Sequence, residues 1–275
     1  MLKYLGNKPV LVAGLLAGLM YPGLAPPLAQ QRPPDFSANN AGWISVGGEW
    51  TPLPDSPPPV TQDPAHRYVP NNRGEQPTFR IADISNPNLT QFAKDSLKKT
   101  NEEVLAGKPM WSRSARCWAT GVPAFLLTPA QPMFFVQTPQ QVRMIAQHDN
   151  DVRRVYLNVL HTENPKPSWY GESVGHYEGD TLVVDTIGLN DKTFVDNYRT
   201  PHSEKLHVVE RYKLVNDGKT LQVTFRVEDP DTFYKPWSAI GNLRRVKMPM
   251  HEEHCAENNQ NLFDYHIPVA SKPDF

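Results

Sequence analysis

The sequence is short of cysteine, of long apolar runs and of net charge, and each shortage narrows what the protein can be. Only two cysteines occur in 275 residues, which excludes a disulfide-rich scaffold. The formal net charge is −1, without the basic footprint of a nucleic-acid binder. The main apolar run, residues 10–20, is about half the roughly 20 residues that span a bilayer. We therefore expect no nucleic-acid partner and no membrane-spanning segment.

The N-terminal segment has the layout of a secretory signal peptide. Lys3 and Lys8 precede the apolar run, and small residues and prolines follow it up to Ala29. Because this order of basic, apolar and small residues is typical of exported proteins, we predict a signal peptide over residues 1–29 and a periplasmic or secreted mature protein. An uncleaved membrane anchor is the alternative, although Pro22 interrupts the apolar run.

The two cysteines, Cys117 and Cys255, form an even pair in a protein expected to enter an oxidising compartment. Such a pair predicts one disulfide. A catalytic thiol or a metal ligand is the alternative interpretation.

The rest of the chain divides by composition into an arm and a domain. Residues 30–87 are rich in proline and predict an extended arm that docks on the body through a few aromatic side chains. Residues 88–275 form the predicted domain, which begins with one helix over 88–106. Asn86 or Asn88 could cap this helix, and Gly107 stops it.

From about residue 123 the pattern changes to short strands joined by short turns. Two hairpins are clear: residues 174–187 turn at Gly179 and Asp180, and residues 206–228 turn over 216–219. Roughly eight such strands predict a mainly β fold. We expect an antiparallel meander, closed into a calycin- or lipocalin-like barrel or folded into a curved sandwich.

The hairpin over 206–228 places one carboxylate on an apolar face. Strict alternation puts Glu210 in the same row as Val208 and Tyr212, opposite Phe225. A carboxylate is costly to bury without a partner. Glu210 therefore either faces a cavity, where it could transfer protons, or is satisfied by an arginine or a backbone amide.

The second hairpin carries a histidine and an aspartate on one face. His176 and Asp185 are diagonal neighbours across the strand pair, and an imidazole beside a carboxylate is a usable general-base pair. The alternative is that the uncharged face, with Tyr177, Leu182 and Val184, is the core and that His176 and Asp185 point to water.

Further polar and aromatic residues are candidates for binding a substrate. Two adjacent arginines on a strand point to opposite faces, so at most one of Arg153 and Arg154 faces inward, and we assign Arg154 to the site. The predicted substrate-binding residues are Arg154, His148, Tyr177, Tyr212, Trp169 and Trp237. No histidine spacing fits a recognised metal site, so no metal and no organic cofactor are predicted.

Several stretches together resemble a family of exported bacterial proteins to which no activity is assigned. They are residues 168–186, SWYGESVGHYEGDTLVVDT in one-letter code, with 115–117, 147–156, 190–193, 201–202, 206–212 and 255–259. The resemblance covers residues 90–275. It implies export and a shared fold, and it implies no reaction.

These observations predict an exported enzyme that acts on a small hydrophobic or aromatic molecule in an aromatic-lined barrel pocket. Glu210, His176 and Asp185 would perform acid–base chemistry of the lyase, isomerase or hydrolase type without a cofactor. One alternative is a periplasmic, lipocalin-like carrier of a hydrophobic small molecule. Another is a non-catalytic envelope protein with a filled core.

Overall fold

In the computed structural model, the described part of the chain is mainly β-structure. The elements are β1 (Gly42–Ser45), β2 (Thr51–Pro52), α1 (Gln91–Leu105), a short 3-10 helix (Ala124–Leu127), β3 (Met133–Gln137), β4 (Gln141–Ala146), β5 (Val152–Leu157), β6 (Glu172–Glu178), β7 (Thr181–Ile187), β8 (His207–Val215), β9 (Thr220–Glu228) and β10 (Trp237–Val246). The structure describes residues 33–37, 42–47, 50–67, 69, 80–106, 118–127, 131–147 and 151–252. All of them belong to one unit, Arg32–Phe275.

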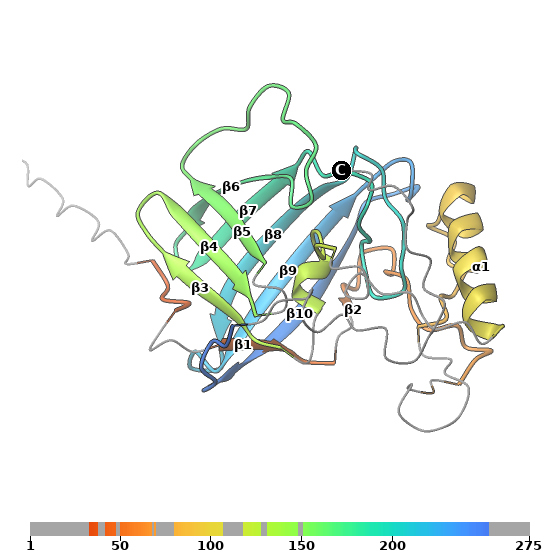
Figure 1. Cartoon of the computed structure of the whole chain (residues 1–275), viewed down its shortest axis with the longest axis horizontal. Helices are drawn as coiled ribbons and strands as arrows, with labels where there is room; N and C mark the ends of the chain where they lie inside the picture. Colours follow the sequence, from red (N-terminus) through yellow and green to blue (C-terminus); the bar gives the residue numbers. More distant parts are fainter. Residues whose placement is uncertain are drawn as a thin grey trace, which may run out of the picture. The chain divides into compact units, whose positions relative to one another are not determined.

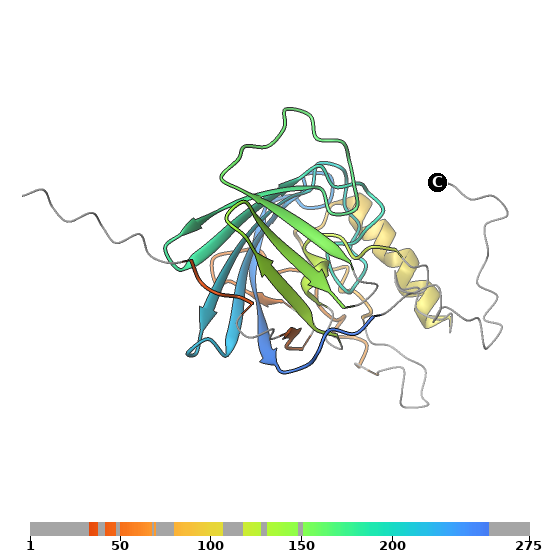
Figure 2. The same cartoon turned by 60° about the vertical axis from the view of Figure 1, so that its left-hand side comes forward.

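The strands form a closed barrel, as Figures 1 and 2 show. Their order is β1-β3-β4-β5-β6-β7-β8-β9-β10-β2, and β1 also pairs with β10. This second pairing closes a nine-stranded mixed barrel. The predicted β-barrel with one helix is confirmed.

One strand pair departs from the predicted meander. β5 and β6 are parallel, with Val155 opposite Ser173 and Leu157 opposite Gly175. A parallel pair needs a crossover connection, commonly a helix. Here residues 158–171 make the crossover as a long loop without a helix, drawn in green at the top of Figures 1 and 2.

The proline-rich arm is part of the barrel rather than a covering segment. Its β1 pairs with β10 on one side, from Gly42 opposite Val246 to Ser45 opposite Leu243, and with β3 on the other. Trp43 of β1 is completely buried, and its indole nitrogen donates a hydrogen bond to the Phe36 carbonyl at 2.8 Å. The arm therefore closes the barrel wall.

Both predicted hairpins form with the predicted register. Glu178 pairs with Thr181 and His176 with Val183 in the β6–β7 hairpin. In the β8–β9 hairpin, Glu210 lies opposite Phe225. The alternating burial of β8 and β9 follows from their period of two, which sends every second side chain into the barrel.

The predicted helix forms as α1 over Gln91–Leu105, but its cap differs from the prediction. The N-cap is Thr90, whose hydroxyl accepts a hydrogen bond from the Ala93 backbone nitrogen at 3.3 Å. Asn88 instead bonds to the backbone of Lys235 in both directions at 2.9 Å, which fixes the start of the helix to the chain before β10. α1 is not long and apolar enough to span a membrane, and this holds for every described helix.

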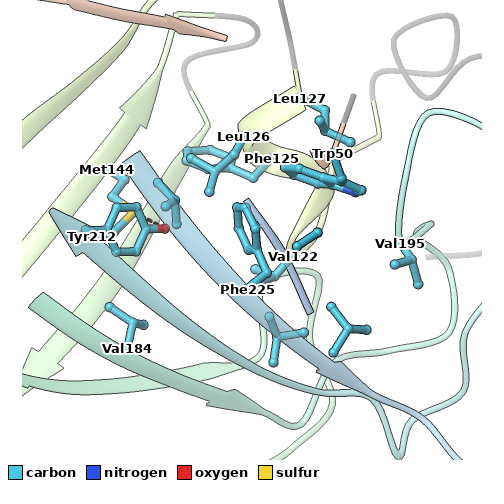
Figure 3. Close-up of a cluster of buried hydrophobic side chains, with 14 of the residues drawn as sticks. Trp50, Val122, Phe125, Leu126, Leu127, Met144, Val184, Val195, Tyr212 and Phe225 are labelled. Atoms are coloured by element: carbon cyan, nitrogen blue, oxygen red, sulfur yellow. Dashed lines mark hydrogen bonds between the residues drawn. The ribbon is translucent and has the colours of Figure 1, made fainter. Parts of the chain in front are cut away.

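Large apolar side chains fill the interior. Figure 3 shows Trp50 and Phe225 beside Phe125 of the short 3-10 helix, with Tyr212 next to Met144. The Trp50 and Phe225 ring centroids are 4.5 Å apart. A cavity next to Trp43 and Phe125 has a volume of only about 10 Å³, room for about one water molecule.

Candidate functional site

An ion pair crosses the barrel interior where the sequence predicted a misplaced carboxylate. Arg153 of β5 and Glu210 of β8 are both completely buried. Nη1 of Arg153 donates to Oε1 of Glu210 at 3.0 Å, and Nη2 donates to Oε2. The prediction that Glu210 is buried is confirmed, and the partner is the arginine that the alternative interpretation required.

Hydroxyl groups complete this interior network. Nη2 of Arg153 donates to Thr186 Oγ1 at 2.8 Å, and its Nε and Nη2 donate to Ser173 Oγ at 3.3 Å. Tyr212 donates to Oε1 of Glu210 at 2.8 Å. A buried charge persists only when it is paired and hydrogen-bonded, and this network meets both conditions.

The pKa shifts of Arg153 and Tyr212 show which charge each side chain carries in the network. Burial lowers the pKa of Arg153, but the charge of Glu210, the adjacent Tyr212 and the hydrogen bonds to both together outweigh burial and raise it. Burial and the Glu210 charge raise the pKa of Tyr212 well above its ordinary value. Arg153 therefore stays charged and Tyr212 neutral, so the network acts as a fixed element of the interior.

The predicted shared site of Glu210 with His176 and Asp185 is wrong. His176 lies on the outer face of β6 and bonds to Glu178 at 3.0 Å, whereas Glu210 lies inside the barrel. Successive residues of a strand alternate between faces, and the uncharged face of this hairpin, with Leu182 and Val184, packs into the core. This is the alternative that the sequence left open.

Asp185 does have histidine partners, on the outer face. Its Oδ1 lies 3.0 Å from Nε2 of His161, in the crossover loop, and 2.9 Å from Nε2 of His207, on β8. Nδ1 of His161 lies 3.0 Å from Oε1 of Glu172 at the start of β6. We call these four residues, Glu172, His161, Asp185 and His207, the outer row.

The outer row holds the crossover loop onto the barrel. Thr162, next to His161, donates its backbone N–H to Oε1 of Glu172 at 2.8 Å and its hydroxyl to Oε2 at 3.0 Å. Farther along the loop, the Ser168 N–H donates to the Gly188 carbonyl at 3.0 Å. The loop is therefore attached at both ends of its path over the outer face.

The outer row sets the charge of its members. The hydrogen bond from His207 is the main reason that the pKa of Asp185 lies below its usual value, with a smaller contribution from His161. The same bond raises the pKa of His207. Burial works against the ionised form of Glu172, but its bonds from Thr162 and His161 lower its pKa. Both carboxylates are therefore ionised near neutral pH.

A groove adjoins the outer row between the outer face of β5 and the crossover loop. Its volume is about 460 Å³, within the range of small-molecule sites. It is lined by Val152, Arg154, Tyr156, Thr162, Pro165, Lys166, Ser168, Trp169, Tyr170, Gly171, Glu172 and Ser173. We call it the outer groove. Glu172 belongs both to the groove and to the outer row.

The structure brings two of the predicted substrate-binding residues together and separates the others. Arg154 and Trp169 both line the outer groove. Tyr212 and Trp237 are buried in the barrel, so they do not share that surface. Tyr177 is half-buried on the inward face of β6, where its hydroxyl accepts a bond from Gln137 at 2.9 Å. The proposed aromatic pocket inside the barrel is therefore replaced by a packed core.

Three predicted residues lie outside the described part of the chain. They are His148 and the two cysteines, Cys117 and Cys255. Their expected roles in substrate binding and in a disulfide stay predictions. The expected signal peptide, residues 1–29, also lies outside it.

Sequence reasoning missed most residues of these networks, namely Arg153, Ser173 and Thr186 in the interior and Glu172, His161 and His207 in the outer row. Arg153 shares its face with the buried Val155 and Leu157, so the period of two in β5 could have identified it as the inward arginine. His161 gave no signal, because it lies in a loop without periodicity and meets Asp185 only through the path of the crossover.

Comparisons with known proteins add no name to this site. No family model, no curated protein and no solved structure matches the chain. Among the described residues, no group of three or more histidine, cysteine, aspartate or glutamate side chains is arranged to hold a metal ion.

Proposed function

We propose that this protein is an exported enzyme that binds a small aromatic molecule in the outer groove and transfers a proton on it. The observation that carries the proposal is that Glu172 lines the groove and is also the first member of the outer row. A carboxylate held in one orientation beside a binding surface is a suitable general base. This moves the predicted acid–base chemistry from the barrel interior to its outer face.

Each member of the outer row has a distinct role in this proposal. Glu172 is the catalytic residue, because it is the member of the outer row that lines the groove. His161 is a positioning residue: both its ring nitrogens lie 3.0 Å from carboxylate oxygens, one of Glu172 and one of Asp185. These contacts hold the imidazole ring in place, and the ring in turn orients Glu172.

A binding protein without catalysis is the second candidate. The observation in its favour is that both oxygens of Glu172 already accept hydrogen bonds, Oε1 from the Thr162 N–H and Oε2 from the Thr162 hydroxyl. A carboxylate so fully engaged has less capacity to accept a proton. In this case Arg154, Trp169 and their neighbours would hold a ligand that leaves unchanged.

The experiment is a two-step screen. Small aromatic, terpenoid and sugar compounds are first tested for thermal stabilisation of the wild type and of Trp169→Ala; groove ligands should stabilise only the wild type. Bound compounds with an acidic C–H bond are then incubated in D₂O and followed by NMR. The enzyme should exchange that hydrogen for deuterium, and Glu172→Gln should bind the compound without exchanging it.

The outcomes separate the two candidates. Binding without exchange in the wild type would leave the carrier function and reject the enzyme. Ligands that stabilise wild type and Trp169→Ala equally would place binding elsewhere and reject the groove. Tyr234→Ala is a matched control, since Tyr234 is exposed, lies outside the groove and should not affect either step.

A further inference from the structure

The outer groove contains two cations that have no partner. Arg154 and Lys166 are exposed, and within the described residues neither makes a hydrogen bond or an ion pair. Three exposed cations on β8 and β9 are instead bonded to a carboxylate. These pairs are Arg211 with Glu178, Lys213 with Asp180, and Arg226 with Glu228. Within the described part of the chain, the charges of Arg154 and Lys166 thus have no direct carboxylate partner.

A third cation lies beside Arg154 across the sheet. Arg143 of β4 is directly opposite Arg154 of β5, and both side chains are on the exposed outer face. Arg143 bonds to the neutral Gln141 at 3.3 Å. Like charges placed directly opposite each other in a sheet destabilise it. An anion bound between the arginines would remove that repulsion.

The carboxylate of the groove does not cancel this charge. Glu172 is turned toward the crossover loop, where its oxygens accept bonds from Thr162 and it pairs with His161 at 3.0 Å. The groove therefore has two free cations among its lining residues and one carboxylate that already has its own partners.

The aromatic side chains of the groove define the rest of the ligand. Tyr156, Trp169 and Tyr170 line it together with the two cations. Trp169 packs against Trp118 in a tilted arrangement with ring centroids 5.5 Å apart, and Lys192 lies 5.9 Å from the Trp169 ring centroid. These contacts hold the Trp169 ring in place. A fixed aromatic surface beside a guanidinium suits a flat ring that carries an oxyanion.

From this geometry we infer that the outer groove selects a small aromatic oxyanion, a ring bearing a carboxylate or a phosphate, over its neutral counterpart. The ring lies against Trp169 and Tyr156, and the oxyanion pairs with Arg154 and Lys166. The inference rests on the binding half of the proposed function and names the class of its ligand. It does not depend on proton transfer by Glu172.

The test is a set of matched titrations on the full chain. Benzoate, 2-naphthoate and phenyl phosphate are compared with benzamide, 2-naphthamide and phenol, and binding is followed by the NMR signals of the tryptophan indole groups. The anions should bind at least about tenfold more tightly than the neutral compounds at low salt, and high salt should reduce the difference. Comparing benzoate with phenyl phosphate shows which oxyanion fits better.

Variants assign the effect to the groove. Arg154→Gln and Lys166→Gln should each weaken anion binding about tenfold, as expected when a charge-assisted hydrogen bond is lost, and should leave the neutral compounds unaffected. Arg244→Gln is the matched control, because Arg244 is an exposed arginine of β10 outside the groove.

Three results would overturn the inference, and they have different meanings. Equal binding of anions and neutral compounds, abolished by Trp169→Ala, would reject selection by charge but keep the groove as a binding site. Anion binding that is unchanged in Arg154→Gln and Lys166→Gln, or no binding by either panel, would reject the groove as the site. If the groove is rejected as the site, the proposed function fails as well.

Discussion

Arg153 and Arg154 are consecutive residues of β5, yet the first is completely buried in the barrel and the second is exposed in the outer groove. The buried guanidinium is bonded to Glu210, Ser173 and Thr186. Its exposed neighbour makes no ion pair within the described residues. Burial makes pairing obligatory, because an unpaired charge in the interior is very costly. Exposure makes pairing optional, which leaves the charge available for a ligand.

Replacing a charged side chain by a neutral one should therefore have different consequences on the two faces of the barrel. On the inner face it should affect the stability of the fold and on the outer face the binding of ligands.

The largest effect should come from breaking the buried ion pair. Glu210→Gln leaves the Arg153 charge without a counter-charge, and such a change costs about 3–5 kcal/mol. Urea denaturation monitored by circular dichroism measures this loss.

A double variant distinguishes a lost partner from a lost fold. Arg153→Met with Glu210→Leu removes both charges and fills the space with apolar groups, so it should be more stable than Glu210→Gln. If the double variant were less stable than Glu210→Gln, the ion pair would stabilise the fold by more than the cost of burying its two charges. That result would contradict our account of the interior.

A smaller effect is expected from Tyr212→Phe. The substitution removes the hydroxyl that donates to Glu210 at 2.8 Å and keeps the ring. A hydrogen bond to a charged group contributes about 1.5–3 kcal/mol, so the free energy of unfolding should fall by about that amount. Tyr234→Phe, at an exposed position, should leave it unchanged.

The outer row should give a pH dependence that the interior network lacks. Because Asp185 raises the pKa of His207, the folded state holds this proton more tightly than the unfolded state. The resulting stability is fully present below the unfolded pKa of about 6.5 and is lost as the pH rises through the higher folded value. Both groups are half-exposed, so solvent screening limits the effect to about 1 kcal/mol or less.

Unfolding free energies measured from about pH 6 to pH 8 test this dependence. His207→Gln should reduce the slope, because it removes the hydrogen bond to Asp185. A slope that is the same in wild type and His207→Gln would show that the row does not couple to folding in this range.

The smallest stability change should come from Arg154→Gln. An exposed charge without a partner contributes within about 0.5 kcal/mol, and removing it also relieves the repulsion with Arg143. The free energy of unfolding should therefore stay the same or rise slightly, while anion binding falls. If Arg154→Gln lost about as much stability as Glu210→Gln, the proposed difference between the inner and outer faces would be contradicted.

The sequence predicted those parts of the fold that depend on local periodicity. The alternation from Leu206 to Val227 is enough to place Glu210 on a buried face opposite Phe225. The two-residue turn at Gly179 and Asp180 fixes the register of the β6–β7 hairpin. In both hairpins a shift of the register by one residue would expose the apolar side chains, so the pattern is compatible with a single register.

The sequence could not predict the features that depend on how distant elements meet. The parallel pairing of β5 with β6 needs a crossover, and residues 158–171 have no periodicity that reveals its path. Without that path, neither the outer groove nor the contact of His161 with Asp185 can be anticipated. Arg153 is an intermediate case. The alternation of β5 is enough to predict that its side chain points inward, but its partner Glu210 lies 57 residues away in the sequence.

The four residues of β1 have a consequence for the behaviour of the chain in solution. This short strand covers β3 and β10 at once. Without it, both strands would present rows of unpaired backbone donors and acceptors, which readily recruit strands from other molecules. A chain that lacks its first 46 residues should therefore self-associate, even with every other strand intact. We therefore expect β1 to protect the barrel against aggregation by covering the edges of β3 and β10.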